Sequence, residues 1–283
     1  MNYTEQPLFI PCAGEQILGI LALPETPADI GIVLAVGGPQ YRVGSHRQFV
    51  LLSRKLAEAG YTVLRFDYRG MGDSSGEQRA FDDVSVDIAA AADALQAACP
   101  PAQRIVLWGL CDAASAALIY WQATRDSRIA GLCLINPWVR SEATLARTQV
   151  KHYYGQRLFA GEFWWKLVRG EVGVGKALGG LFRSLRLSAQ IPVAAGRDLS
   201  FQARMLLALQ ACSAPMFVML SGQDFVAREF IEYASIDPAW AGVLARPNIA
   251  RQEFPDADHT FSTAQWRSQV EQATINWLDQ VVR

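Results

Sequence analysis

The feature that most constrains the fold is a regular alternation of short apolar runs with helical stretches along most of the chain. The apolar runs are rich in Val, Ile and Leu and end in turns that contain Gly, Pro or Ser, which is typical of buried strands. Alternation of this kind predicts an α/β fold whose mostly parallel central sheet is covered by helices on both faces. The predicted strands are 7–11, 16–24, 30–36, 61–67, 104–108, 129–135, 216–220 and 249–254, and the predicted helices are 45–59, 82–98, 111–123, 225–246 and 263–282.

The alternation breaks between residues 137 and 212, in a stretch rich in Trp, Phe and Arg. We interpret 137–212 as a helical cap inserted into a single α/β core made of 1–136 and 213–283. Residues 170–177 nearly match a phosphate-binding loop but lack its Ser or Thr and a preceding buried strand, so no nucleotide site is expected. The aromatic side chains of the cap could cover an apolar pocket or form the cap's own small core; they are Trp138, Phe159, Phe163, Trp164 and Trp165.

Composition narrows the classes of function. Hydrophobic residues make up 51% of the chain and the formal net charge is −1, which argues against disorder and against nucleic-acid binding. The chain opens without a targeting signal and contains no apolar run long enough to span a membrane, so we expect a cytoplasmic protein. Its five cysteines are scattered, without metal-ligand spacing. We therefore expect free thiols, and neither a metal nor a cofactor.

One cysteine is distinguished by its position. Residues 109–113, Gly-Leu-Cys-Asp-Ala, lie where the predicted strand 104–108 meets the next predicted helix. Such a strand–turn–helix junction is the nucleophile elbow G-x-S-x-G, here with Cys111 in place of serine and Ala113 in place of the second glycine. A helix N-terminus and an adjacent imidazolium favour a thiolate near neutral pH, which makes cysteine an effective nucleophile there. The alternative is that Cys111 is a small buried residue without a chemical role.

A second segment matches the serine motif literally. Residues 72–76, Gly-Asp-Ser-Ser-Gly, lie several residues beyond their predicted strand, and no helix follows them directly. Because the strand–turn–helix context is missing, we interpret Ser74 as part of a turn and favour Cys111 as the nucleophile.

The general base can be sought among three histidines. His259 follows the last predicted strand, in the loop before the final helix, where this topology brings a triad histidine beside the elbow. His46 opens the predicted helix 45–59, and His152 lies in the insertion. We therefore predict that His259 is the base.

The third member of a triad must orient the imidazole and stabilise its charged form. Asp224 comes just past the carboxyl end of the predicted strand 216–220, the edge at which open α/β sheets bind ligands. Asp256 and Asp258 are nearer to His259 in sequence, but we expect them to cap or shape its loop. We predict that Asp224 is the acid.

Acyl transfer also requires donors directed at the developing oxyanion. The backbone N–H of Asp112, directly after the nucleophile, supplies one. The second should come from the loop after strand 30–36, where Pro39 has no N–H. The sequence leaves Gln40 and Gly38 as alternatives for this donor.

With these pieces in place, the chain resembles the α/β-hydrolase superfamily from about residue 30 to its C-terminus. The Gly-x-Cys-x-Ala elbow is similar to that of dienelactone-hydrolase-type enzymes, which implies a Cys-Asp-His triad. Three segments resemble the exosortase-A-system-associated hydrolases, type 1, which are encoded with bacterial exopolysaccharide and protein-sorting machinery. These segments are 36–47 (Val-Gly-Gly-Pro-Gln-Tyr-Arg-Val-Gly-Ser-His-Arg), 109–112 (Gly-Leu-Cys-Asp) and 151–154 (Lys-His-Tyr-Tyr).

The expected function is hydrolysis of a small-molecule ester or thioester through a covalent acyl-enzyme. An acyltransferase that passes the acyl group to a sugar or another alcohol, linked to exopolysaccharide production, is the first alternative. A catalytically inactive binding protein with the same fold is the second. The sequence does not indicate an oligomeric state.

Overall fold

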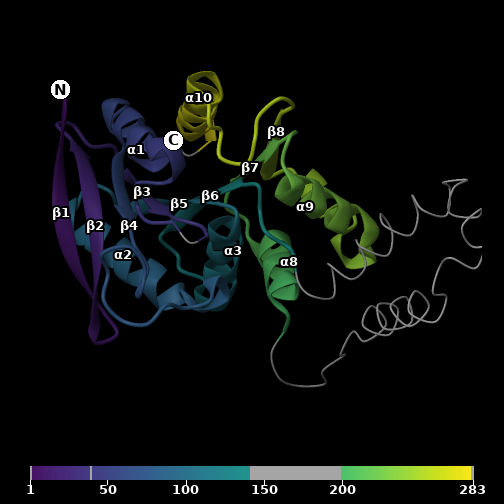
Figure 1. The fold of residues 1–283 in the computed structure, drawn as a ribbon, viewed down its shortest axis with the longest axis horizontal. Coiled ribbons are helices and arrows are strands. Elements are labelled where there is room, and N and C mark those ends of the chain that lie inside the picture. Colours follow the sequence, from purple (N-terminus) through teal and green to yellow (C-terminus); the bar gives the residue numbers. More distant parts are fainter. Residues whose placement is uncertain (1, 39, 141–198, 282–283) are drawn as a thin grey trace, which may run out of the picture. The chain divides into compact units, whose positions relative to one another are not determined.

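The computed structural model describes residues 2–38, 40–140 and 199–281. Their strands form one eight-stranded sheet in the order β1-β2-β4-β3-β5-β6-β7-β8 (Figure 1). The strands are β1 Tyr3–Cys12, β2 Glu15–Pro24, β3 Ile30–Ala35, β4 Thr62–Phe66, β5 Arg104–Leu110, β6 Ile129–Ile135, β7 Met216–Ser221 and β8 Ile249–Phe254.

Strand direction divides the sheet into two parts. β1 and β2 form an antiparallel hairpin, and β2 is also antiparallel to β4. Every pairing from β4 through β3, β5, β6 and β7 to β8 is parallel. The predicted mostly parallel sheet is therefore confirmed. Because parallel strands point the same way, the carboxyl ends of β3, β5, β6 and β7 meet at one edge, where the candidate site lies.

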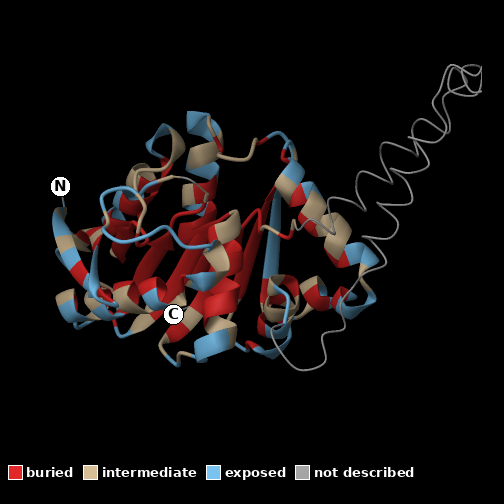
Figure 2. Cartoon of the chain, turned by 60° about the horizontal axis from the view of Figure 1, so that its bottom comes forward, coloured by how far each residue is buried: buried red, intermediate tan, exposed pale blue. Residues whose placement is uncertain are grey.

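Helices cover both faces of the sheet. α1 and α10 lie on one face, and α2, α3 and α8 lie on the other (Figure 1). The central strands are buried, whereas β8 at the edge has exposed residues along most of its length (Figure 2). The helices are α1 Gln48–Glu58, α2 Ser85–Ala98, α3 Asp112–Thr124, α8 Phe201–Ala211, α9 Phe225–Ile236 and α10 Ala264–Val281.

The two faces are packed by different kinds of side chain. Under α1 and α10, large aromatic rings fill the space, with Phe217 stacked on Trp277 at 5.7 Å and Phe49 edge-on to Trp108 at 5.9 Å. On the other face, α2 and α3 present mainly buried alanines together with a few larger aliphatic residues. Small side chains let these helices lie close to the sheet, which holds the start of α3 firmly against the end of β5.

Two helix boundaries differ from the sequence prediction. The helix predicted over 45–59 begins at Gln48, because His46 and Arg47 have φ values of 54° and 59° and form a 3₁₀ turn with Ser45. The helix predicted over 225–246 ends at Ile236. There the side chain of Asp237 accepts a hydrogen bond from the N–H of Ala239 and begins a separate 3₁₀ turn.

Contacts divide the chain into two compact units, Met1–Trp138 with Ser200–Arg283, and Val139–Leu199. The predicted cap, 137–212, lies mostly outside the described residues and stays a prediction, as do its aromatic cover and the residues 170–177. α8, at the end of that range, belongs to the first unit and packs against α3. Within the described part of the chain, no helix is both long and apolar enough to cross a membrane.

Candidate active site

Cys111 occupies a sharp junction between the end of β5 and the start of α3. Its backbone has φ 63° and ψ −127°, a combination that side-chain-bearing residues rarely adopt. Such a conformation costs about 1–3 kcal/mol and persists only where the surrounding structure imposes it. Here the N–H of Cys111 donates to the carbonyl of Ile135 at 2.9 Å, and the Cys111 carbonyl accepts from the N–H of Ala114 at 3.1 Å. The strained residue is thus fixed from both sides.

The turn leaves no room for a side chain at position 109. A Cβ atom on Gly109 would lie 2.6 Å from the carbonyl carbon of Ala113, which is closer than real contacts allow. The second small residue of the motif is less critical, because Ala113 fits as a fully buried residue. The glycine that the sequence retains is therefore the one that the geometry requires.

The five cysteines differ in accessibility. Cys12, Cys99, Cys133 and Cys212 are buried, and Cys111 alone is partly exposed. Burial raises the pKa of the Cys12, Cys133 and Cys212 thiols, which makes them poor nucleophiles. Cys111 also lies at the N-terminus of the 13-residue helix α3, where the helix dipole favours an anion.

His259 and Asp224 form a hydrogen-bonded pair. His259 Nδ1 lies 2.8 Å from Asp224 Oδ2. The Asp224 carboxylate is 5% exposed and also accepts from the N–H groups of Val226 at 3.0 Å and Ala227 at 3.2 Å, so it caps α9. These backbone donors fix the carboxylate, and the carboxylate in turn fixes the imidazole ring and favours the Nδ1–H form.

His259 interacts with Cys111 on its other side. Burial alone would lower the pKa of His259, but hydrogen bonds to Asp224 and Cys111, and their charges, raise it to about 10. The imidazole is therefore protonated at neutral pH. Cys111, His259 and Asp224, which come from three separate loops, thus form one continuous chain of polar contacts.

Cys111 and His259 line a cavity of about 400 Å³. Leu110, Phe81 and Trp138 contribute apolar walls to it. Gly38, Gln40 and Asp112, the residues expected to stabilise an oxyanion, line the same cavity. Of the predicted site residues, all except Asp224 line this one hollow, and Asp224 is bonded to the Nδ1 of His259.

The two alternatives for the second oxyanion donor have different surroundings. The N–H of Gly38 donates to Asp112 Oδ1 at 2.6 Å, so this donor is already occupied. The side-chain Oε1 of Gln40 accepts a hydrogen bond from the N–H of Ser45 at 3.0 Å. This contact uses the side chain of Gln40 and not its backbone N–H, which is the group that would stabilise an oxyanion. Burial raises the pKa of the Asp112 carboxyl, although backbone donors including Gly38 act in the opposite direction.

The loop that carries Gln40 and Arg42 is attached to the end of β4 by a buried ion pair between Arg42 and Asp67. The N–H of Arg42 donates to Asp67 Oδ1 at 2.5 Å, and its guanidinium pairs with Asp67 and, at 2.6 Å, with Asp73. Asp67 is 1% exposed. A buried carboxylate of this kind requires such a partner, so the ion pairs hold the loop beside the elbow.

Asn136 supports the site, although its sequence context did not predict this role. It is fully buried at the end of β6, and its side chain accepts from the N–H of Ser221 at 2.8 Å and donates to Ser221 Oγ at 2.9 Å. It also donates to the carbonyl of His259 at 3.3 Å. This amide therefore connects the strand that leads to Asp224 with the loop that carries His259. The only sequence signal was a polar residue between Ile135 and Pro137.

The rival residues have other roles in the structure. Ser74 donates its hydroxyl to the carbonyl of Asp67 at 2.8 Å and accepts from the N–H of Leu18 at 2.9 Å, which makes it part of a turn. Asp258 accepts from the N–H of Thr260 at 3.2 Å and from Ser262, and so shapes the loop around His259. Asp256 and His46 are exposed, and His152 lies outside the described residues.

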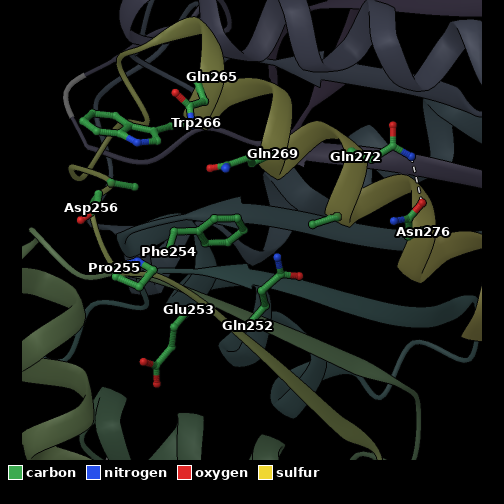
Figure 3. A pocket seen from close by; sticks show the side chains of 12 residues that line it. Gln252, Glu253, Phe254, Pro255, Asp256, Gln265, Trp266, Gln269, Gln272 and Asn276 are labelled. Carbon is green, nitrogen blue, oxygen red and sulfur yellow. Dashed lines mark hydrogen bonds between the residues drawn. The ribbon is translucent and has the colours of Figure 1, made fainter.

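A second large hollow, about 410 Å³, lies between β8 and α10 (Figure 3). Amide side chains dominate its walls, with Trp266 at one end and Glu253 and Asp256 as its carboxylates. It contains neither a thiol nor a histidine.

No group of three or more His, Cys, Asp or Glu side chains in the described ranges could hold a metal ion. The amide side chains of the hollow between β8 and α10 are Gln252, Gln265, Gln269, Gln272 and Asn276. The Cys111 cavity, which has a thiol and a histidine, is therefore the better candidate for a catalytic site.

A mostly parallel sheet with helices on both faces, an elbow after β5 and a histidine after the last strand together define the α/β-hydrolase fold. Residues 32–273 match the alpha/beta hydrolase family, and the chain belongs to that family. A search of curated proteins finds no match.

Solved structures show the same fold at low sequence identity. An esterase from Pyrococcus furiosus is 16% identical, with a TM-score of 0.67 over 99% of this chain and 94% of its own. A thermophilic esterase from Thermogutta terrifontis, with malate bound, is 20% identical, with a TM-score of 0.58 over 98% of this chain and 100% of its own. Est1E from Butyrivibrio proteoclasticus, with ferulic acid bound, is 16% identical, with a TM-score of 0.62 over 97% of this chain and 99% of its own.

Proposed function

We propose that the chain is an acyl hydrolase, a carboxylesterase or thioesterase, that acts through Cys111, His259 and Asp224. The observation that carries the proposal is the position of Cys111 on a strained elbow, in contact with an imidazole that Asp224 holds at 2.8 Å. The esterase descriptions of two proteins with this fold, from Pyrococcus furiosus and Thermogutta terrifontis, support the same class of reaction.

The proposed reaction begins with attack of the Cys111 thiolate on the carbonyl carbon of the substrate. The carbonyl electrons move onto the oxygen, which the N–H of Asp112 and a donor from the Gly38–Gln40 loop stabilise. The intermediate collapses as the bond to the leaving group breaks, and the protonated His259 gives its proton to that group. The product of this step is a thioester between Cys111 and the acyl group.

Hydrolysis of the thioester completes the cycle. His259, now neutral, accepts a proton from water as the water oxygen attacks the acyl carbon. The second tetrahedral intermediate releases the carboxylic acid and the Cys111 thiolate, and His259 is again protonated. Asp224 orients the ring and stabilises its charged form in both halves of the reaction.

Intact-mass spectrometry can detect the acyl-enzyme. Incubation with p-nitrophenyl acetate, butyrate and octanoate, followed by intact-mass spectrometry, should show the mass of one acyl group on the wild-type chain. The Cys111→Ala variant should show none, and Ser74→Ala should be labelled like the wild type. Absence of an adduct on the wild type, or an adduct that survives Cys111→Ala, would contradict the proposed nucleophile.

The resemblance of segments 36–47 and 109–112 to exosortase-associated hydrolases supports a role close to exopolysaccharide production. In that setting the natural acceptor could be a sugar hydroxyl in place of water. The same assay with added alcohols distinguishes the two reactions, because transfer yields a new ester and hydrolysis yields only the free acid.

A further inference from the structure

A smaller hollow lies beside the Cys111 cavity, on the α2 side of the elbow. Its volume is about 260 Å³, and Val36, Met71, Val84 and Ala113 supply apolar walls. This volume is below the roughly 300 Å³ at which pockets for whole drug-sized ligands begin, so it suits one fragment of a substrate.

The two hollows are adjoining. Gly38, Phe81 and Asp112 line both of them. Phe81 is held in place by edge-on contact with Phe201, with ring centres 5.1 Å apart. A substrate whose carbonyl lies at Cys111 could therefore extend one short branch past Asp112 into the smaller hollow.

Tyr68 lines this hollow and carries an unused hydrogen-bond donor. The residue is 5% exposed and its ring packs edge-on against Phe66 at 5.1 Å, which fixes its direction. Within the described ranges its buried hydroxyl has no hydrogen-bond partner. Buried polar groups without partners are rare in native proteins, and each one calls for an explanation. Burial, with the charges of Asp112 and Asp87, raises the pKa of Tyr68 well above its usual value, so the hydroxyl keeps its proton.

Asp112 brings the complementary acceptor. Its carboxylate accepts from backbone N–H groups, including that of Gly38 at 2.6 Å. A carboxylate has about four lone-pair positions, so capacity remains for another donor. Two residues that line one small hollow thus carry a donor and an acceptor, which suits an alcohol because its hydroxyl can both donate and accept hydrogen bonds.

We propose that this hollow binds a free hydroxyl group of the substrate, with Tyr68 donating to that hydroxyl and Asp112 accepting from it. The proposal rests on the proposed function, because the hollow gains its meaning from the carbonyl at Cys111. It narrows the substrate class to esters or thioesters that carry a hydroxyl close to the scissile carbonyl. The hydroxyl can belong to the acyl chain or to the alcohol that leaves.

Matched substrate pairs test the proposal on both sides of the ester. For the acyl side, kcat/KM is compared between the p-nitrophenyl esters of butyrate and 3-hydroxybutyrate. For the alcohol side, it is compared between propyl butyrate and 2,3-dihydroxypropyl butyrate. The wild type should prefer the hydroxylated member of one pair, and the pair that shows the preference identifies where the hydroxyl resides.

Tyr68→Phe removes only the donor. It should reduce that preference about tenfold while kcat/KM for the plain ester stays unchanged. Tyr120→Phe is the matched control, because the Tyr120 hydroxyl is already bonded to Asp126 at 2.6 Å, away from both hollows. Thermal unfolding of both variants verifies that they are folded.

Four results would overturn the inference. A wild type that hydrolyses plain and hydroxylated esters equally removes the hydroxyl subsite and leaves the proposed function intact. A preference that survives Tyr68→Phe, or a loss of activity shared equally by both esters, assigns Tyr68 a purely structural role. Absence of any Cys111 adduct with any of the esters removes the proposed function, and the subsite with it.

Discussion

Two segments of this chain carry nearly the same motif and fold into different structures. Residues 109–113, Gly-Leu-Cys-Asp-Ala, join β5 to α3, whereas residues 72–76, Gly-Asp-Ser-Ser-Gly, form a turn beyond β4. The second matches the serine pattern literally, and the first replaces two of its letters. Even so, the first has the geometry of a nucleophile elbow.

Hydrogen bonding explains the difference. The hydroxyl of Ser74 is committed to the carbonyl of Asp67 and to the N–H of Leu18, so it ties the turn to the sheet. Cys111 has its backbone fixed in a strained conformation, which leaves its side chain directed to the cavity that His259 also lines. A nucleophile is therefore recognised by what the backbone imposes and by what the side chain is free to do.

The largest expected effect separates the two segments by activity. Cys111→Ala should lower kcat/KM for a p-nitrophenyl ester by about 10⁴-fold or more, because it removes the atom that forms the covalent bond. Ser74→Ala should leave kcat/KM within about twofold of the wild type. Initial rates, corrected for the uncatalysed reaction, give both values. Equal losses in the two variants would contradict the difference in role.

Much of this contrast could be predicted from the sequence, because strand and helix patterns are local. The alternation of elements predicted the sheet, and the position of the motif relative to a strand distinguished Cys111 from Ser74. The pairing of Asp224 with His259, 35 residues apart, followed from the order of strands in the fold.

Other features depend on how distant backbone segments meet and were not predictable. Gly38 donates its N–H to Asp112 across 74 positions of sequence, and Asn136 reaches Ser221 across 85. The buried Tyr68 hydroxyl lacks a partner within the described part of the chain, which only a three-dimensional account of donors and acceptors can reveal. Sequence patterns indicate where a side chain lies on an element and not which backbone group it will contact.

The next largest effect concerns His259. Asp224→Asn should reduce kcat/KM by about 10³-fold, since the ring loses its orientation and its charged partner. Asp224 and Cys111 raise the pKa of His259 to about 10, against burial, which lowers it. The wild type should therefore stay active until the pH approaches 10 and lose activity above it. In the variant this alkaline limb should move to lower pH.

The same shift has a consequence for stability. Because the folded-state pKa of His259 is raised from 6.5 to about 10, its contribution to the free energy of unfolding is complete below about pH 6.5. That contribution is lost as the pH rises to about 10. The stability difference between wild type and Asp224→Asn, measured by urea unfolding, should shrink over this interval. A difference that is constant with pH would contradict the coupling.

We expect smaller effects from substitution of a glycine in each of the two segments, Gly109 in 109–113 and Gly76 in 72–76. Gly109→Ala should cost about 1–3 kcal/mol of stability and lower activity as well, because its Cβ would meet the Ala113 backbone at 2.6 Å. Gly76→Ala, at φ 92°, should cost about 1–2 kcal/mol from backbone strain and leave kcat/KM unchanged. Urea unfolding and ester hydrolysis on the same samples separate the two effects. Full activity in a folded Gly109→Ala would show that the elbow tolerates widening.

The smallest effect isolates the structural role of Ser74. Ser74→Ala removes two hydrogen bonds that join the turn to β2 and to the end of β4, and we expect a loss of about 1 kcal/mol in the free energy of unfolding. Ser75→Ala, whose hydroxyl makes its contacts at the exposed surface, should cost less. The order of these two losses matters more than their size. If Ser75→Ala were the more damaging, the exposed contacts of Ser75 would hold the turn, and the part-buried hydrogen bonds of Ser74 would no longer explain why the literal serine motif folds as a structural turn.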